Sequence, residues 1–318
     1  MSFAANQEQP RTEYATFDIQ VHTVDYMNYD SLKFALRGID LVISTVSGTE
    51  QLNLIRAAGE GSVRRFVPSE FEGKLSATGR SSRDDPLRPN SMSSHAFQLL
   101  RHFEQSRRMK YTVFSCGILM ETFHSHGLSL FNMGASLGVS NPGDFLLNIN
   151  TATATYTHRN ANGRRVHICL TSAYDLGRFI VAALELGPSH WPSEYTLRGD
   201  RLTIEGLVET CGRLQNGKCY PPVEVTIEME ADVRCLTVQY THHRCEVQDL
   251  PGFIDYATQS GEVEQATYYR RLLATANGRY DFNTASLNER IAASASVNFT
   301  PMTFEQWLGR VLYPTPPE

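Results

Sequence analysis

Gly-Ile-Asp-Leu-Val-Ile-Ser-Thr-Val-Ser-Gly at residues 38–48 and Arg-Arg-Phe-Val-Pro-Ser-Glu-Phe-Glu-Gly at residues 64–73 decide the fold of this chain. Each stretch begins with a short apolar run and ends in small or polar residues, as buried strands do. The residues between them carry apolar side chains at helical spacing: Leu52, Leu54, Ile55, Ala57 and Ala58. A strand, a helix and a strand in about thirty residues form a βαβ unit. Such a unit requires a parallel sheet covered by helices.

The carboxyl ends of these two strands are the first candidate site. The first strand ends at Ser44-Thr45-Val46-Ser47, and the second ends at Pro68-Ser69-Glu70-Phe71. Ligands of open parallel sheets bind beyond the carboxyl ends of the strands. Both segments are therefore expected on one rim of the sheet, as parts of a binding site.

The rest of the chain continues the alternation of strands and helices. Strands are expected at 19–24, 111–116, 166–170, 195–198 and 223–227, and helices at 30–36, 93–107, 173–186, 204–214, 261–276 and 303–312. Asn28 or Asp30 is expected to cap the first helix. This order predicts an α/β fold with a parallel sheet and helices on both faces over residues 19–190. A smaller α+β substrate lobe is expected at 191–318, and residues 1–18 read as an irregular segment.

The composition indicates an enzyme-sized protein, since 318 residues carry a formal net charge of −5 with charges of both signs. No basic stripe marks a nucleic-acid partner. No run of eighteen apolar residues exists, and the first twenty residues lack the apolar core of a signal peptide. Six cysteines are ordinary usage for a reduced chain of this size. We therefore expect a cytoplasmic protein without nucleic-acid or membrane partners.

Several blocks together resemble the NmrA-like and isoflavone-reductase-like family, an atypical branch of the short-chain dehydrogenases. They are Val-Asp-Tyr-Met-Asn-Tyr-Asp-Ser-Leu at 24–32, Leu-Arg-Gly-Ile-Asp-Leu-Val-Ile-Ser-Thr-Val at 36–46, Arg-Arg-Phe-Val-Pro-Ser-Glu-Phe at 64–71, Tyr-Thr-Val-Phe at 111–114 and Tyr-Asp-Leu-Gly-Arg at 174–178. The Arg-Phe-Val-Pro-Ser-Glu-Phe block is the specific one. The resemblance covers residues 19–200 and implies a Rossmann-like domain that binds NADP or NAD.

The resemblance also implies a role for individual residues. Asp25 matches the carboxylate that faces the adenine, with Tyr26 beside it. Contacts to the rest of the cofactor are implied for Ser44, Thr45, Val46, Ser47, Gln51, Pro68, Ser69, Glu70, Phe71, Cys116, Gly117, Ile118 and Leu119. Two structural alternatives stay open: Asp25 as a turn or capping residue, and the small rim residues as close-packed strand ends.

Members of this family open with a strand, a glycine-rich turn and a helix that receives the pyrophosphate. The first glycine of this chain is Gly38, so the fold is expected to be N-terminally truncated. A truncated sequence and a genuine variant that binds no nucleotide both remain open. We expect weak binding of NAD(P)H, and we expect residues 3–17 or a second chain in a homodimer to cover the exposed strand edge.

The family's reductases hold a lysine at the start of the helix expected at 93–107. Counting back from Glu104, this position falls on Ala96, with His95 beside it. His95 is the candidate acid or base because imidazole titrates near neutrality. Ser69 and Glu70 are further catalytic candidates, and a solvent-facing loop residue is the alternative reading of His95. No lysine occupies the required position; the chain has Lys33, Lys74, Lys110 and Lys218.

Weaker patterns lie in the C-terminal half. Zinc sites need four convergent ligands, usually with tight Cys spacing. The run Cys235, His242, His243 and Cys245 lacks that spacing, so no metal site is expected. Cys211 and Cys219 flank a polar turn and are expected to be free thiols. Aromatic residues there suit either a lobe over a flat substrate or an ordinary core: Phe253, Tyr256, Tyr268, Tyr269 and Phe282.

Three function classes remain open on this basis. The first is an NAD(P)H-dependent oxidoreductase that acts on a small aromatic or polyketide-like metabolite, as the isoflavone-reductase side of the family implies. The second is an NmrA-like regulator that senses a dinucleotide without turnover, and the missing lysine favours it. The third is a cofactor-independent cyclase or isomerase that uses the same pocket with His95.

Overall fold

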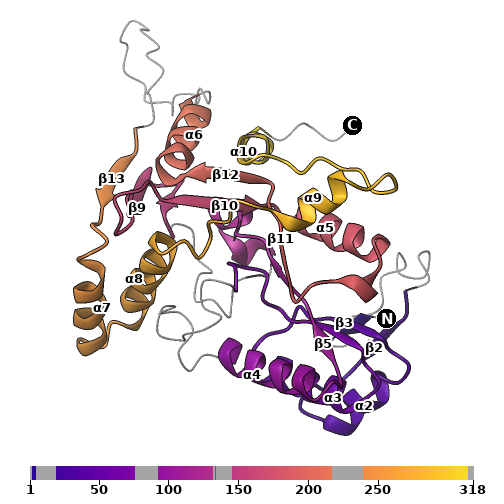
Figure 1. Cartoon of the computed structure of the whole chain (residues 1–318). Coiled ribbons are helices and arrows are strands. Elements are labelled where there is room, and N and C mark those ends of the chain that lie inside the picture. Colours follow the sequence, from indigo (N-terminus) through magenta and orange to yellow (C-terminus); the bar gives the residue numbers. More distant parts are fainter. Residues whose placement is uncertain are drawn as a thin grey trace, which may run out of the picture. The chain divides into compact units, whose positions relative to one another are not determined.

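The structure, a computed structural model of the chain, describes residues 2–4, 19–75, 92–131, 133, 145–216 and 239–313 (Figure 1). The chain forms two compact units. The first comprises Met1–Phe71, Arg88–Phe114 and His190–Tyr195, and the second comprises Glu72–Leu87, Ser115–Ser189 and Thr196–Glu318. Residues 115–189, which the sequence assigned to the first domain, thus belong with the C-terminal residues.

The first unit is built on the expected βαβ plan. Strands β3 (Leu41–Ile43), β4 (Arg65–Val67) and β5 (Lys110–Tyr111) form a parallel sheet in that order. Helices α3 (Gly48–Glu60) and α4 (Met92–Gln105) pack side by side (Figure 1). A Cβ on Gly59 would lie 2.5 Å from the ring of Phe103, so glycine allows the two helices to approach this closely.

The N-terminal residues depart from the expectation of an irregular segment. Strand β1 (Ser2–Ala4) pairs in parallel with β2 (Val21–Thr23), although residues 2–4 carry no strand-like apolar run. The pairing itself supplies the backbone hydrogen bonds that define this short strand. The following helix α2 (Tyr29–Ala35) is capped as expected, because the Asn28 side chain accepts a hydrogen bond of 3.1 Å from the Ser31 amide.

The strand expected at 111–116 is divided in two. Its first part belongs to β5, whereas β6 (Val113–Ser115) pairs with β11 (Glu194–Thr196). A change of pairing partner along one extended stretch is invisible to an analysis of hydrophobic pattern. The strand expected at 223–227 lies outside the described residues.

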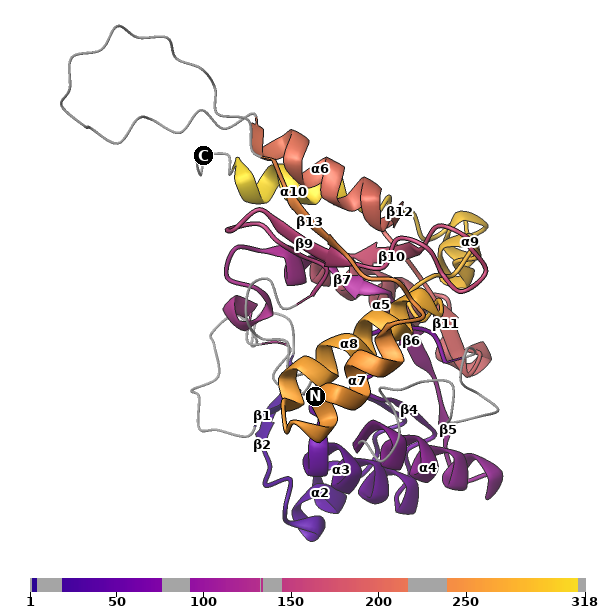
Figure 2. The ribbon, with the colours of Figure 1, turned by 90° about the vertical axis from the view of Figure 1, so that its left-hand side faces the viewer.

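The second unit contains two small sheets. Strand β10 (His167–Thr171) lies between the parallel β7 (Ile118–Leu119) and the antiparallel β12 (Asp200–Thr203). The second sheet has the order β13 (Thr241–Arg244), β9 (Thr153–Tyr156), β8 (Leu147–Asn148). Helices α6 (Ile204–Asn216) and α10 (Phe304–Leu312) pack against each other, as do α7 (Leu250–Gln259) and α8 (Val263–Ala276) (Figure 2).

The expected helices are present to within two residues at each end, including α5 (Ala173–Glu185). The sequence missed α7 and α9 (Ser286–Ala292) and most of the short strands. Short 3₁₀ turns complete the described elements: Met120–Phe123, Leu128–Phe131 and Pro188–His190.

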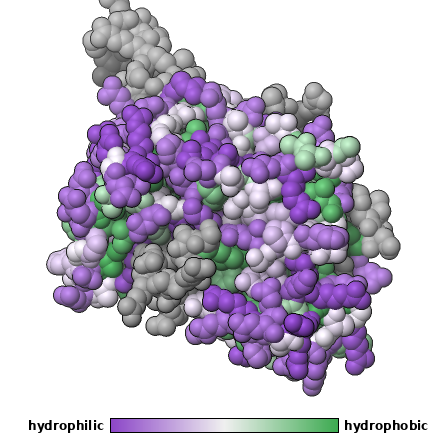
Figure 3. Space-filling model, viewed as in Figure 1, coloured by the Kyte–Doolittle hydropathy of each residue, from purple (hydrophilic) through white to green (hydrophobic). Residues whose placement is uncertain are grey.

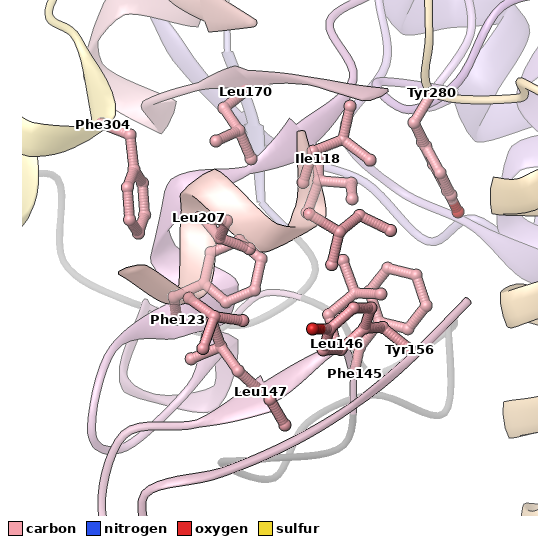
Figure 4. Close-up of a cluster of buried hydrophobic side chains, with 14 of the residues drawn as sticks. Ile118, Phe123, Phe145, Leu146, Leu147, Tyr156, Leu170, Leu207, Tyr280 and Phe304 are labelled. Atoms are coloured by element: carbon pink, nitrogen blue, oxygen red, sulfur yellow. The ribbon is translucent and has the colours of Figure 1, made fainter. Parts of the chain in front are cut away.

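A hydrophobic core fills the second unit. Buried side chains from the 118–123 segment, both sheets, α6 and the C-terminal segments meet there: Ile118, Phe123, Phe145, Leu146, Leu147, Tyr156, Leu170, Leu207, Tyr280 and Phe304 (Figure 4). Phe282 is also buried, and Tyr268 and Tyr269 pack against this core. Phe253 and Tyr256 are exposed instead, because α7 buries only Leu250 and Ala257.

Hydrophilic residues predominate on the face drawn in Figure 3, where hydrophobic residues appear in small separate groups. Within the described ranges, no helix combines the length and the apolar character that crossing a bilayer requires.

Candidate cofactor site and buried charge cluster

The rim of the β3–β4 sheet brings the two predicted segments together. The Ser44 amide donates to the carbonyl of Val67 at 2.8 Å, and the Ser69 amide donates to Oε1 of Gln51 at 2.6 Å. Thr45 is exposed at this rim, and Pro68 is buried. The geometric expectation for these segments of the first unit is therefore met.

Gln51 acts as a clamp in this arrangement. Its side chain is buried, and its carbonyl oxygen holds the Pro-Ser-Glu-Phe turn against the first turn of α3. The turn is tight, since the Glu70 amide also donates to the Pro68 carbonyl at 2.8 Å. Gln51 thus positions Ser69 and Glu70, whatever else it contacts.

The start of α3 faces the same rim. Ser47 is the N-cap residue, but its hydroxyl makes no capping bond, and Gly48 has a φ of 70°. The first amides of an α-helix have no partner within the helix, and together with the helix dipole they attract anions. This helix start can therefore hold a phosphate group.

Asp25 already has a structural task. Its Oδ1 accepts a hydrogen bond of 2.8 Å from the Met27 amide, and its carbonyl accepts one of 3.0 Å from the Asn28 amide. The turn role weighed for this aspartate is therefore present, and the carboxylate is exposed. Tyr26 is buried, and burial raises the pKa of its hydroxyl.

The predicted rim segment Cys116–Leu119 belongs to the second unit, so its place beside the other two segments stays a prediction. Gly117 has a φ of 78°, and a Cβ there would lie 2.1 Å from the carbonyl oxygen of Cys169. Burial raises the pKa of the Cys116 thiol, and the thiolate is the reactive form. In this segment, Ile118 is buried and Leu119 is half-buried, as close-packed strand ends are.

His95 lies in the first turn of α4, and its side chain is exposed. Ala96, which the residue count placed at the lysine position, is fully buried. A lysine at position 96 would therefore enter the core, and His95 points to a different environment. The catalytic role of His95 stays a prediction.

The sequence missed a buried charge cluster in the second unit. Tyr280 donates its hydroxyl hydrogen to Oε1 of Glu72 at 2.7 Å, and Nη2 of Arg279 donates to Oε2. Lys74 binds the same segment, because its Nζ donates to the carbonyl of Asp281 at 2.6 Å. Glu72 and Arg279 stand 207 positions apart, so no sequence spacing relates them.

Electrostatics fix the protonation state of this cluster. Burial acts to raise the pKa of Glu72, but the charges of Arg279 and Arg271 and the bonds from Arg279 and Tyr280 outweigh it and lower the pKa to about 2. Burial, followed by the Glu72 charge, raises the pKa of Tyr280 to about 12. At neutral pH Glu72 is thus ionised and Tyr280 is neutral.

A second missed feature is His124, which follows β7 and the 3₁₀ turn Met120–Phe123. The His126 amide donates to its Nδ1 at 3.1 Å, so the ring proton of the neutral form is on Nε2. Burial, and then His126, lower the pKa of His124. A neutral imidazole with a fixed Nε2–H is a hydrogen-bond donor. The available signal was a histidine that follows shortly after the predicted rim segment Cys116–Leu119.

No group of three or more His, Cys, Asp or Glu that suits a metal ion occurs in the part of the chain that the structure describes. Cys219 and Cys235 lie outside it. The described cysteines are free thiols: Cys116, Cys169, Cys211 and Cys245.

A parallel βαβ sheet with small polar residues along its carboxyl rim defines a Rossmann-like protein. Family comparison makes this specific: the chain belongs to the NmrA-like family, which matches residues 6–236. The family resemblance and the Rossmann-like α/β fold expected from the sequence are therefore confirmed.

Two relatives match this chain over regions of different length. Over 51 residues the chain is 49% identical to the isoflavone reductase homolog A622 of Nicotiana tabacum. This match covers 15% of the present chain and 16% of the relative. Over 225 residues the chain is 26% identical to the oxidoreductase BOA1 of Botryotinia fuckeliana, and this match covers 65% of each chain. The matches thus span less than two thirds of either relative's length.

Solved structures share the fold over most of their length. An isoflavone reductase has a TM-score of 0.58 with 15% identity, covering 97% of this chain and 90% of the other. The NADPH-dependent quinone oxidoreductase QOR2 of Escherichia coli, in complex with NADPH, has a TM-score of 0.59 with 16% identity, covering 98% and 89%. At this identity the similarity establishes the fold.

Proposed function

We propose that this protein is an NADP(H)-dependent oxidoreductase of the isoflavone-reductase-like type that reduces a small aromatic or polyketide-like metabolite in the cytoplasm. The observation that carries the proposal is the rim of the first unit, where Gln51 clamps the Pro-Ser-Glu-Phe turn beside Ser44–Ser47. Membership of the NmrA-like family supports it, as do relatives described as isoflavone reductase homologs and oxidoreductases.

The residues of the rim fit a dinucleotide in chemical terms. The uncapped start of α3 at Ser47 and Gly48 offers main-chain donors to a phosphate. The exposed Asp25 carboxylate keeps acceptor capacity for an exocyclic amine, because only its Oδ1 is engaged by Met27. When bound, a nicotinamide supplies the hydride. Ser69 and Glu70 then orient groups at the rim, and His95 is the proposed proton donor.

Cofactor binding is tested directly by fluorescence titration of NADPH and NADH into the purified chain. Val46→Glu places a negative charge on the rim and should abolish binding through repulsion of the phosphates. Val181→Glu, at an exposed position of α5, is the matched control and should leave binding unchanged. Lack of saturable binding by the unaltered chain would refute the proposal. A dissociation constant in the low micromolar range or tighter would contradict the expectation of weak binding.

Turnover is then followed as NADPH oxidation with a quinone, an isoflavone and a lignan such as pinoresinol. Proteins of similar structure include a quinone oxidoreductase, an isoflavone reductase and a protein in complex with pinoresinol. Consumption of NADPH that depends on one of these compounds supports the oxidoreductase. Binding without consumption of NADPH favours a dinucleotide-sensing regulator instead.

The regulator is the second candidate because of one observation on α4. The helix start carries the fully buried Ala96 and the exposed His95, and neither is the lysine of the family's reductases. A sensor needs the rim but no proton donor. A panel that yields binding but no turnover, with His95→Ala unchanged in binding, would select it.

A further inference from the structure

A small polar pocket lies in the second unit, between the hairpin of residues 158–166 that leads into β10 and the end of helix α8. Its volume is about 210 Å³. At about 30 Å³ for each water molecule, this space holds about seven waters or one small molecule. The lining residues are 160–162 and 165–167 on the hairpin side, and 275–278 with Asp281 on the helix side. All of them belong to the second unit.

The pocket lies at the opposite end of β10 from the predicted rim segment Cys116–Leu119. Strand β10 begins at His167, which lines the pocket, and ends at Thr171, which pairs with Leu119. The two ends of this five-residue strand are about 13 Å apart. Ligands of parallel sheets bind beyond the carboxyl ends of the strands. A pocket at the amino end of β10 is therefore distinct from the predicted cofactor rim.

The hairpin side of the pocket carries a positive charge and an amide donor. Nε of Arg165 lies 4.0 Å from Oε2 of Glu205, which is too long for a hydrogen bond. Glu205 is also shared, because Nη2 of Arg244 lies 3.7 Å from its Oε1. Oδ1 of Asn160 accepts two backbone amides of the hairpin turn at 3.0 Å each, which leaves its Nδ2 group as a donor. A guanidinium and an amide donor suit a carboxylate.

Acceptors come from the end of α8 and from His167. Helix α8 ends at its C-cap Asn277 in the pocket lining, and the last carbonyls of a helix lack helical partners and carry the negative end of its dipole. Nδ1–H of His167 donates to the Arg165 carbonyl at 3.1 Å, so the neutral ring keeps Nε2 as an acceptor. The Asp281 carboxylate is paired with Arg201 at 2.8 and 3.1 Å. The acceptors left over suit an ammonium group.

We propose that this pocket binds a small zwitterion, a free α-amino acid. Arg165 and Nδ2 of Asn160 receive its carboxylate, and the end of α8 with Nε2 of His167 receives its ammonium group. An anion without a positive charge would face the negative helix end, and a cation without a negative charge would face Arg165. A ligand that carries both charges matches both sides of the pocket. This second site goes beyond the proposed function and does not rest on it.

The experiment is calorimetric titration of the full chain with L-serine, N-acetyl-L-serine, L-serinamide and glucose. The acetyl group removes the positive charge of the amino acid, and the amide removes its negative charge. We expect each of these two analogues to bind about tenfold more weakly than L-serine. Glucose offers hydroxyl groups without charge and should bind no better than the analogues.

Arg165→Met removes the charge on the hairpin side and should weaken L-serine binding about tenfold. Its side chain is 63% exposed, so the fold should persist. The matched control is Arg164→Met, which is exposed on the same hairpin but outside the pocket lining, and it should leave binding unchanged.

Three results would overturn the inference: no saturable binding of L-serine, an analogue or glucose that binds as tightly as L-serine, or full L-serine affinity in Arg165→Met. The titration uses neither NADPH nor turnover, so its outcome is separate from that of the proposed function. A chain that binds NADPH but not L-serine would lose this second site and keep the oxidoreductase proposal.

Discussion

Replacing Glu72 by glutamine tests the electrostatic account of the second unit. In the folded protein the pKa of Glu72 is lowered from 4.5 to about 2, chiefly because Arg279 and Arg271 outweigh the effect of burial. Each unit of pKa difference between folded and unfolded states corresponds to about 1.4 kcal/mol. The ionised carboxylate therefore contributes about 3 kcal/mol to the free energy of unfolding at neutral pH. The Glu72 side chain is 17% exposed, so solvent screening reduces this value only modestly.

The sign of the pH dependence follows from the direction of the shift. A carboxyl group whose pKa is lower in the folded state stabilises the fold fully above its unfolded pKa. Its contribution is lost as the pH falls from about 5 toward 2, because the unfolded chain takes up the proton first. Removing one partner of a buried ion pair also leaves the other charge unpaired, which costs about 3 to 5 kcal/mol.

Urea unfolding at pH 7, 5, 4 and 3 measures both effects. At pH 7 we expect Glu72→Gln to lower the free energy of unfolding by about 3 kcal/mol or more. Because other carboxyl groups titrate in both proteins, the difference between the unaltered chain and Glu72→Gln isolates this residue. The difference should shrink steadily below pH 5. Glu185→Gln, at an exposed position of α5, is the control and should change little. A difference that stays constant from pH 5 to pH 3 would refute the reasoning.

Three further changes have defined outcomes. Gly117→Ala should lower the free energy of unfolding in urea by about 2 to 5 kcal/mol, because residue 117 has a positive φ and an added Cβ would clash with Cys169. The control Gly187→Ala should lower it by only about 1 to 2 kcal/mol, because residue 187 has a positive φ but open space around it. Gln51→Ala leaves the Ser69 amide without its acceptor, so unfolding should cost about 1 to 3 kcal/mol less and NADPH titration should show weaker binding. His95→Ala should lower turnover about a hundred- to ten-thousandfold while the melting temperature stays the same, and unchanged turnover across the accessible pH range would remove it from the mechanism.

The fold of the first unit was predictable because its information is local. Val42 and Phe66 lie in adjacent parallel strands and are both buried, and the helix between those strands buries Leu54 and Ile55. A continuous apolar run marks a strand covered on both faces, and the 3.6-residue period marks the helix. The capping of α2 by Asn28 was predictable for the same reason, because an N-cap side chain bonds to an amide only three residues away.

The buried charge cluster was not predictable, because its members meet only through the tertiary fold. Glu72 follows Phe71 in the family block, but Arg279 and Tyr280 come from the turn after α8. Sequence spacing carries no signal over 207 positions. Strand β1 was not predicted for a related reason, because a three-residue strand is defined by the strand it pairs with rather than by its own composition.

The two histidines His95 and His124 differ in their surroundings, which the residue type alone does not reveal. His95 was chosen for its place beside the family's lysine position, and it is exposed on the first turn of α4. His124 was not chosen, yet its Nδ1 accepts from the His126 amide, and burial lowers its pKa. The neutral His124 ring carries its proton on Nε2, so it donates a hydrogen bond without first binding a proton. If His95→Ala keeps its turnover, the acid–base role of His95 is wrong, and Ser69 and Glu70 are the remaining catalytic candidates that the sequence predicts.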